Sequence, residues 1–353
     1  MKILFIICIT ILLCCIPEMP EFERINNERL RVLAVIFTPG PEVAPGDTVT
    51  AKAYFAGKQA AGVDNFKVSY SRTASDSFID HSALNIIKVK HWFPDSVELS
   101  FKVSESLFIT DKNETGIPSD AIRAVHAASG DSAGCEQLED NFGKDIAHQM
   151  IDALFKESAL FFTIHSEDGT TLKVQSRFMA RYTPRFKKCV PVNNNPEPSK
   201  IFFYSVAEDS VKDFDPTSSV FKGKFTAQMI YNPDTLLNTA ETLHVVKGCS
   251  YFLIADSVKA DTYTNNLGKE KNEIIKYSYF YEIDDGMRNS DSIITKATPT
   301  SPIAEFRISE ITGQCLIKIW LVTHDDCNDA IRPKGFALST MSIVVIPEDE
   351  DSP

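Results

Sequence analysis

The feature that most constrains the fold is a series of short runs in which apolar and polar residues alternate. The run Ser96–Val103 places four apolar residues at every second position, namely Val97, Leu99, Phe101 and Val103. A period of two is typical of half-buried antiparallel strands, because successive side chains point to opposite faces of a sheet. Turn residues bound these runs, and many short strands separated by turns predict a β-sandwich.

Strand-like runs stand on both sides of one segment that is rich in Pro and Asn. Residues 187–199 contain little that could be buried, so we expect a linker there. The chain is long enough for two domains. The sequence therefore predicts one β-sandwich over residues 29–186, a second over residues 200–347 and a solvated acidic tail over residues 348–353.

One part of the first predicted domain, residues 111–157, lacks the alternating pattern. Within it, residues 144–156 carry apolar side chains at helical spacing: Ile146, Met150, Ile151, Leu154 and Phe155. We expect a helical insertion between strands at this place. A β-hairpin is expected next, with Asp168 and Gly169 in its turn. The predicted fold class is mainly β, with two tandem sandwiches, the first of which has a helical insertion.

The N-terminus has the pattern of a secretory signal peptide over residues 1–14. Lys2 precedes an apolar run that is too short to span a bilayer, which needs roughly 20 apolar residues. An ordinary cleavage site needs small residues, but the first twenty residues contain no Ala, Gly or Ser. The polar residues 15–28 that follow are predicted to form a short tether.

The residues Leu12–Cys15 resemble the lipobox of bacterial lipoproteins, with leucine at position −3 and the lipidated cysteine at Cys15. Cys14 stands where Gly or Ala is usual, so Cys14 is the alternative acceptor. The resemblance implies acyl chains that anchor the exported protein in a membrane. The competing interpretation is an ordinary signal with Cys14 as its small residue, which would release a soluble protein.

Three further stretches extend the resemblance over most of the chain. They are Arg31–Val35 with Pro41–Val49, then Lys276–Phe280, then Ile319–Asp326. Together they are similar to uncharacterised bacterial lipoproteins with tandem immunoglobulin-like or fibronectin-like sandwiches. The resemblance implies a place in the cell envelope, on the outer membrane and facing the periplasm or the cell surface. It also implies that Tyr279 packs at the core centre and that Trp320 lies on a facing strand.

The net charge and the lack of catalytic motifs exclude some classes of function. The net charge of −12 argues against a nucleic-acid partner, because phosphate contacts need clustered Lys and Arg. Asp145, His148 and Asp152 would share one face of the predicted helix, but exposed helix faces commonly carry such residues. We therefore expect no catalytic residues, no cofactor and no enzyme. The alternative is an exported hydrolase with its site near the helical insertion.

Two acidic clusters are weak candidates for a metal site. One consists of Asp284, Asp285 and Asp291, and it does not follow the spacing of an EF-hand loop. The other consists of His324, Asp325 and Asp326, whose mixed ligand types suit no single metal. For both clusters we expect plain solvated loops without a metal.

Five cysteines follow Cys15: Cys135, Cys189, Cys249, Cys315 and Cys327. Export permits disulfides, but an odd number cannot all pair with one another. The candidates we favour are Cys315 with Cys249 or Cys315 with Cys327.

Aromatic residues alternate at Tyr277, Tyr279 and Tyr281. Such a stripe binds sugar rings when it is exposed, or fills the core when it is buried. The sequence as a whole predicts a membrane-anchored lipoprotein with a structural or binding role, whose ligand is a protein or a glycan.

Overall fold

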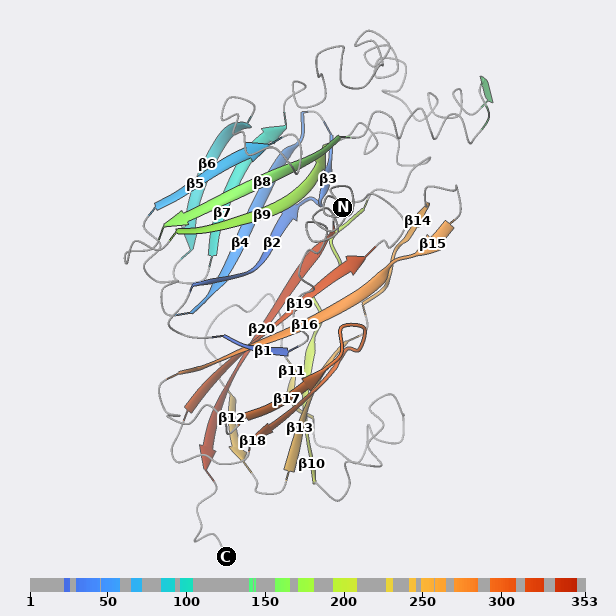
Figure 1. The fold of residues 1–353 in the computed structure, drawn as a ribbon. Helices are drawn as coiled ribbons and strands as arrows, with labels where there is room; N and C mark the ends of the chain where they lie inside the picture. The colour runs from blue at the N-terminus through green and yellow to red at the C-terminus, as the bar shows by residue number, and fades with distance from the viewer. Residues whose placement is uncertain are drawn as a thin grey trace, which may run out of the picture.

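The structure is a computed structural model of the chain. It describes residues 22–25, 30–44, 46–57, 65–71, 84–92, 96–103, 140–141, 143, 156–165, 171–180, 193–207, 227–230, 241–245, 249–256, 258–264, 270–284, 293–308, 315–326 and 334–347. These residues lie mostly in β-strands, as the alternating pattern predicts (Figure 1). None of the described residues belongs to a helix with the length and hydropathy of a membrane span.

The first sandwich consists of two sheets with four strands each. One sheet has, in spatial order, β2 (Arg31–Thr38), β4 (Thr48–Ala56), β7 (Ser96–Val103) and β6 (Leu84–Trp92). The other has β3 (Glu42–Val43), β9 (Thr171–Ala180), β8 (Lys156–His165) and β5 (Asn65–Ser71). Neighbouring strands are antiparallel, except that β3 pairs in parallel with β9.

The core of the first sandwich contains the residues that the period of two selects. Val97, Leu99, Phe101 and Val103 are all buried. Phe178 of β9 joins the two sheets, because its ring centroid lies 5.5 Å from that of Phe37 and 5.6 Å from that of Phe101. The hairpin of β8 and β9 is confirmed, with His165 opposite Thr171. Its predicted turn at Asp168 and Gly169 lies outside the described residues.

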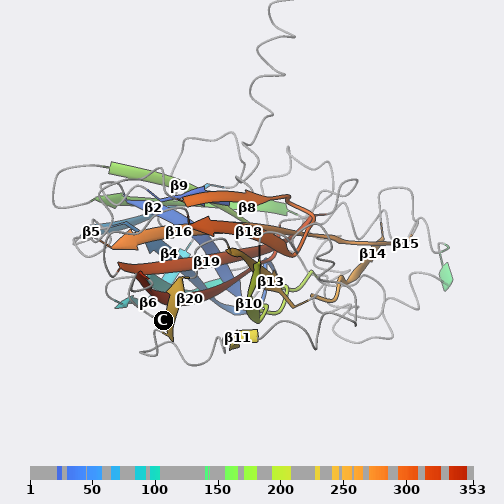
Figure 2. The same cartoon turned by 90° about the horizontal axis from the view of Figure 1, so that it is seen from below.

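The second sandwich has two sheets with five strands each, and a small hairpin of β14 (Thr262–Thr264) and β15 (Glu270–Asn272). One sheet has, in spatial order, β1 (Phe22–Arg24), β16 (Ile274–Asp284), β19 (Cys315–Asp326), β20 (Phe336–Pro347) and β12 (Glu241–Val245). The other has β11 (Ala227–Ile230), β10 (Ile201–Ala207), β13 (Cys249–Ala255), β18 (Ile303–Ile308) and β17 (Ile293–Ala297). Figure 2 shows the same strands from below, where those of the two sandwiches overlap in projection.

The order of the strands identifies both sandwiches as immunoglobulin-like. In that fold the first, second, fifth and fourth strands share one sheet, and the third, sixth and seventh share the other. The first sandwich has this order in β2-β4-β7-β6 and β5-β8-β9. The second repeats it in β10-β13-β18-β17 and β16-β19-β20. In each, a short strand, β3 or β12, pairs in parallel with the last strand.

The core of the second sandwich contains the aromatic stripe of β16. Tyr277, Tyr279 and Tyr281 are at most 5% exposed, so this stripe fills the core and offers no surface to a sugar. The Tyr279 hydroxyl donates a hydrogen bond to the Pro302 carbonyl oxygen at 2.6 Å, and burial raises the pKa of this hydroxyl. The expected place of Tyr279 at the core centre is confirmed. Trp320, however, lies on β19 beside β16 in the same sheet, opposite Phe280, and not on a facing strand.

The helical insertion receives no support from the structure, because most of residues 111–157 lie outside the described chain. Of the predicted helix over residues 144–156, only Lys156 is described, and it begins strand β8. Asp140 and Asn141 are described and exposed, and Gly143 follows with a φ of 79°.

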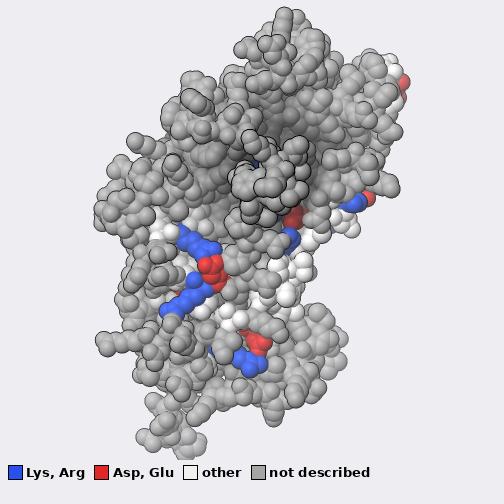
Figure 3. Space-filling model, in the orientation of Figure 1, with Lys and Arg blue, Asp and Glu red and all other residues white. Residues whose placement is uncertain are grey.

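Among the residues whose side chains are described, Ile274 is the one large apolar residue that is exposed, at 38%. On the face seen in Figure 3, basic and acidic side chains lie next to one another. The described side chains therefore form no extended exposed apolar patch.

Candidate functional site

The most extensive feature shared by both sandwiches is the apolar contact between them. We call it the junction cluster, and its buried members are Ile25, Leu33, Ala34, Ala56, Phe280, Trp320 and Val322. Leu33, Ala34 and Ala56 come from β2 and β4 of the first sandwich. Phe280, Trp320 and Val322 come from β16 and β19 of the second. A shared buried cluster of this kind resists independent movement of two domains.

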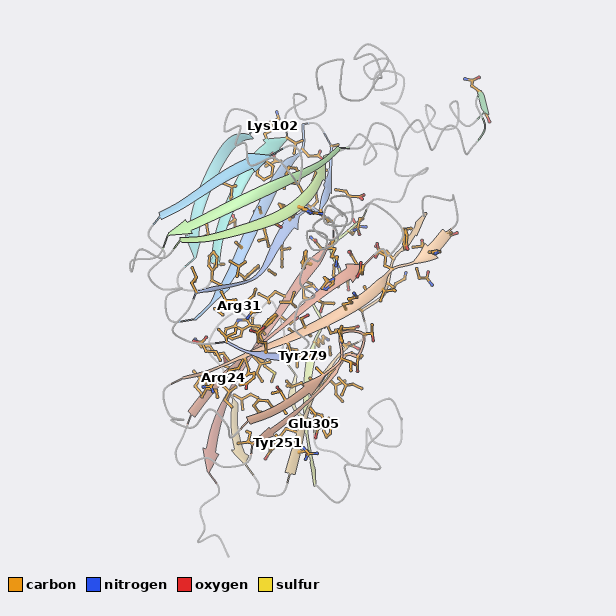
Figure 4. The ribbon with its side chains drawn as sticks, in the orientation of Figure 1. Arg24, Arg31, Lys102, Tyr251, Tyr279 and Glu305 are labelled. Atoms are coloured by element: carbon orange, nitrogen blue, oxygen red, sulfur yellow. The ribbon has the colours of Figure 1, made fainter. Side chains whose placement is uncertain are left out.

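The chain first crosses this junction near its N-terminal end. Strand β1 pairs in parallel with β16, and the Ile25 amide donates a hydrogen bond to the Tyr281 carbonyl oxygen at 2.8 Å. Strand β1 thus lies inside the segment 15–28 for which the sequence predicts a tether. The Arg31 guanidinium forms an ion pair with Glu23 and lies 5.1 Å from the centroid of the Phe280 ring (Figure 4). The first residue of β2 is therefore held by the second sandwich.

The chain crosses the junction again through residues 193–200, which include the described end, 193–199, of the predicted linker. The Asn193 amide donates a hydrogen bond to Oε2 of the buried Glu42 at 2.8 Å. The Asn195 side chain reaches both sandwiches, because its amide donates to the Phe37 carbonyl oxygen and its Oδ1 accepts from the Phe336 amide at 3.2 Å. The Ser339 hydroxyl donates to the Ser199 carbonyl oxygen at 2.6 Å. This part of the linker is packed against the fold.

The predicted cluster His324, Asp325 and Asp326 lies beside this second crossing. These residues continue strand β19 and pair with β16, so they do not form the solvated loop that we expected. His324 is 5% exposed and Asp325 is 1% exposed. Asp325 Oδ1 accepts a hydrogen bond from the Gly335 amide at 2.9 Å, and the His324 ring lies 5.6 Å from that of Phe336. Backbone pairing and local packing together account for the extended strand.

Charges at this end of β19 are balanced by two lysines. Asp326 Oδ2 lies 2.8 Å from Lys276 Nζ and 3.6 Å from Lys334 Nζ. Burial alone would raise the pKa of Asp326, but the hydrogen bond from Lys276 and the charges of both lysines and His324 hold the pKa below its ordinary value. Burial lowers the pKa of His324 to about 4, so the imidazole is neutral at pH 7.

His324, Asp325 and Asp326 serve to hold the end of strand β19 in place. Within the described part of the chain, no three His, Cys, Asp or Glu side chains form a cluster suited to a metal ion. Lys276 and Lys334 form ion pairs with the carboxylate of Asp326, and their positive charges would repel a metal cation. For Asp284 only the backbone at the end of β16 is described, and Asp285 and Asp291 lie outside the described residues.

The cysteines are placed in part. Cys249 is the first residue of β13 and Cys315 the first of β19, in facing sheets. Strand β19 extends from Cys315 to Asp326, about 36 Å, and Cys327 is the next residue of the sequence, outside the described residues. A disulfide needs Cα atoms within about 7 Å, which is incompatible with Cys315–Cys327. Of the two favoured pairs, Cys249–Cys315 stays a prediction. Cys15 lies outside the described residues.

The candidate acid–base residues Asp145, His148 and Asp152 also lie outside the described residues. So does the segment Gly130–Gly134, which reads Gly-Asp-Ser-Ala-Gly and has the Gly-x-Ser-x-Gly spacing of a hydrolase nucleophile turn. This spacing carries no strand or helix period, so the periodic pattern of the sequence does not reveal it. It places Ser132 inside the predicted insertion.

No protein family model matches the chain, and no curated protein matches its sequence. Among solved structures, it is similar to human mucin-like protocadherin EC1-2, with 12% identity, coverage of 91% of this chain and 100% of the other, and a TM-score of 0.18. It is also similar to a marsupial T cell receptor, with 7% identity, coverage of 88% and 95%, and a TM-score of 0.19. These TM-scores are far below 0.5, so the immunoglobulin-like assignment rests on the strand order of the two sandwiches.

Proposed function

We propose that the chain is a lipoprotein of the bacterial cell envelope, anchored through Cys15, which holds a protein or glycan partner at the membrane surface. The lipobox-like Leu12–Cys15 supports the anchor, since more than one acyl chain gives stable attachment. The outer membrane is the proposed location, with the protein facing the periplasm or the cell surface.

The junction cluster is the observation that supports a binding role. Immunoglobulin-like sandwiches carry loops at both ends, and variable domains use the loops of one end to bind. Two sandwiches joined through buried Phe280 and Trp320 hold the strands of both sandwiches in one arrangement. A preorganised surface loses less conformational entropy when a partner binds.

Fatty-acid labelling tests the anchor. The wild type and the variants Cys15→Ala and Cys14→Ala are expressed in a bacterial host with a clickable palmitate analogue, then fractionated. We expect label and membrane association in the wild type, and loss of both in Cys15→Ala. Label that persists in Cys15→Ala but disappears in Cys14→Ala would move the acceptor to Cys14. An unlabelled wild type would remove the lipoprotein proposal.

Cross-linking tests the binding role. The anchored wild type is cross-linked in cells of the native host, and the purified chain is applied to an array of cell-envelope glycans. We expect one protein or glycan class to be captured repeatedly and competed by the purified chain. Failure to capture either would leave a purely structural role.

An exported hydrolase is the second candidate, and the segment Gly130–Gly134 is the observation that favours it. The nucleophile would be Ser132, with a base that the described residues do not supply. Hydrolysis of short p-nitrophenyl esters by the purified chain, compared with Ser132→Ala, tests this directly. Our primary proposal expects equal, background rates from both proteins. Activity that Ser132→Ala abolishes would establish the hydrolase instead.

A further inference from the structure

We propose that the bilayer lies along the side of the molecule that carries β1, beside the junction, so that neither sandwich stands end-on on the membrane. This inference rests on lipid attachment at Cys15, as in the proposed function. It names the surface of the chain that faces the lipid.

Strand β1 provides a fixed point on the fold for the anchored end of the chain. Phe22, Glu23 and Arg24 pair with Tyr279, Phe280 and Tyr281 of β16. Ile25 follows at 1% exposure within the junction cluster, and its amide is bonded to the Tyr281 carbonyl oxygen. The ion pair between Glu23 and Arg31 ties β1 to the first sandwich as well. Any pull on the anchor is therefore transmitted to this place.

The chain between the anchor and β1 is short. Seven Cα–Cα steps separate Cys15 from Phe22, which gives a reach of at most about 25 Å whatever conformation these residues adopt. The lipid-bearing cysteine sits at the membrane interface. The start of β1 is thus held within that distance of the bilayer.

The second sandwich extends at least as far as this reach beyond β1. Phe22 is level with Tyr279, which pairs with Leu321, which in turn pairs with Ser339 of β20. Strand β20 continues eight residues from Ser339 to Pro347, or about 27 Å. If this sandwich stood end-on on the membrane, the bilayer would lie beyond Pro347, about 27 Å from the level of Phe22. The chain from Cys15 to Phe22 reaches at most about 25 Å, so it would be too short even when fully extended.

The first sandwich extends to a similar degree in the other direction. Arg31 contacts Glu23 of β1, and β2 runs from Arg31 to Thr38, about 24 Å further. Figure 1 shows β1 across the strands of the second sandwich, below the strands of the first. The anchor therefore leaves the molecule beside its middle, and the membrane is brought to this side.

The charges near β1 agree with an approach to lipid headgroups. Arg24 and Arg31 lie on this part of the molecule, as Figure 4 shows, in a chain whose net charge is −12. Their guanidinium groups attract anionic headgroups, and the Glu23 carboxylate offsets part of this attraction. The second sandwich presents Arg307, in contact with Glu305, on β18 of the opposite sheet.

Site-specific photocross-linking tests the inference. The lipidated protein is reconstituted into phosphatidylethanolamine and phosphatidylglycerol vesicles, with a benzophenone amino acid in place of Arg24, Lys102 or Arg307. Lys102 is an exposed residue at the end of the first sandwich remote from β1, and Arg307 reports on the opposite sheet. We expect at least fivefold more lipid adduct from position 24 than from either control. Equal or greater adduct from position 102 or 307 would overturn the inference.

A longer tether provides the second variant. Twelve Gly and Ser residues inserted between Met19 and Pro20 should reduce the preference for position 24 several-fold, and an unchanged preference would overturn the role of tether length. Mass spectrometry of the protein before reconstitution separates the two proposals. Absence of lipid on Cys15 contradicts the proposed function, whereas lipid with no preference among the three positions contradicts the orientation alone.

Discussion

The guanidinium of Arg31, at the start of the first sandwich, lies 5.1 Å from the centroid of the Phe280 ring in the second sandwich. A cation above an aromatic face is attracted by the ring quadrupole, and Glu23 orients the same guanidinium. This contact stands at the rim of the junction cluster. It links Arg31, the first residue of β2 in the first sandwich, to strand β16 of the second sandwich.

Truncation of Trp320 should weaken the junction more than any single polar change. Trp320 is 8% exposed within the junction cluster, and Trp320→Ala should cost about 3–5 kcal/mol of unfolding free energy. Urea unfolding followed by circular dichroism measures this loss. Lys318→Ala, two residues earlier on the same strand and half-buried, serves as the control and should change the free energy by less than about 1 kcal/mol. Equal losses in the two variants would contradict a buried role for the indole.

Ile25 should matter to stability although it follows a strand of only three residues. Its side chain is 1% exposed, so Ile25→Ala should cost about 2–4 kcal/mol in the same urea experiment. Arg24→Ala is the matched control, since Arg24 is half-buried and adjacent. If Ile25→Ala unfolded at the wild-type urea concentration, β1 would not be part of the folded structure.

Gly335 should not tolerate a side chain. A Cβ at this position would lie 2.6 Å from Asp325 Oδ2 and 2.7 Å from the Asn194 carbonyl oxygen. The backbone oxygen cannot move without displacing the second crossing, so Gly335→Ala should destabilise the protein by about 1–3 kcal/mol. Thermal unfolding compared with Lys334→Ala tests this. A melting temperature equal to that of the control would show that residues 193–200 do not pack against β20.

Acid should destabilise the protein through His324. Burial lowers its pKa to about 4, so between pH 6.5 and pH 4 the unfolded chain binds a proton that the folded chain does not. The contribution to stability is complete above about pH 6.5, and about 3 kcal/mol is lost as the pH falls to 4. Urea unfolding at pH 7 and pH 4.5 should show this slope in the wild type and a smaller one in His324→Gln. Identical slopes would contradict the burial of the imidazole. The folded-state pKa of Asp326 is lowered below its ordinary value, so protonation of this carboxylate removes further stability at a lower pH than the protonation of His324.

The two sheets of the second sandwich should be joined by a disulfide between Cys249 and Cys315. Both residues begin strands at the same end of the sandwich, because Cys315 and Leu243 both pair with Val345 and Cys249 follows Leu243 closely. Peptide mapping of the exported protein under non-reducing conditions should recover the linked peptides. A linked peptide joining Cys327 to Cys315 would contradict the extended course of β19.

The strands of each sandwich were predictable because apolar and polar residues alternate along a half-buried strand. Val97, Leu99, Phe101 and Val103 are the clearest example. The junction was not predictable, since it joins residues distant in the chain and its contacts leave no period. One hint was present around Phe280 and Trp320, where apolar residues occupy successive positions. Such runs indicate a strand that is buried on both faces.

The candidate site was predictable in its residue types but not in its role. His324, Asp325 and Asp326 stood out as polar residues after an apolar run, which suggested a loop. Pairing with β16 and the contacts of Gly335 and Phe336 extend the strand through them. Strand β1 was missed because three residues are too few to show a period, and its partner strand follows some 250 residues later.

Differential scanning calorimetry of the purified chain tests most directly whether the junction unites the two sandwiches. We expect one transition, with a calorimetric enthalpy equal to the van 't Hoff enthalpy, because neither sandwich can unfold without exposing the junction cluster. Trp320→Ala should split or broaden this transition. Two separate transitions in the wild type, each with its own van 't Hoff enthalpy and neither shifted by Trp320→Ala, would show that the two sandwiches unfold independently.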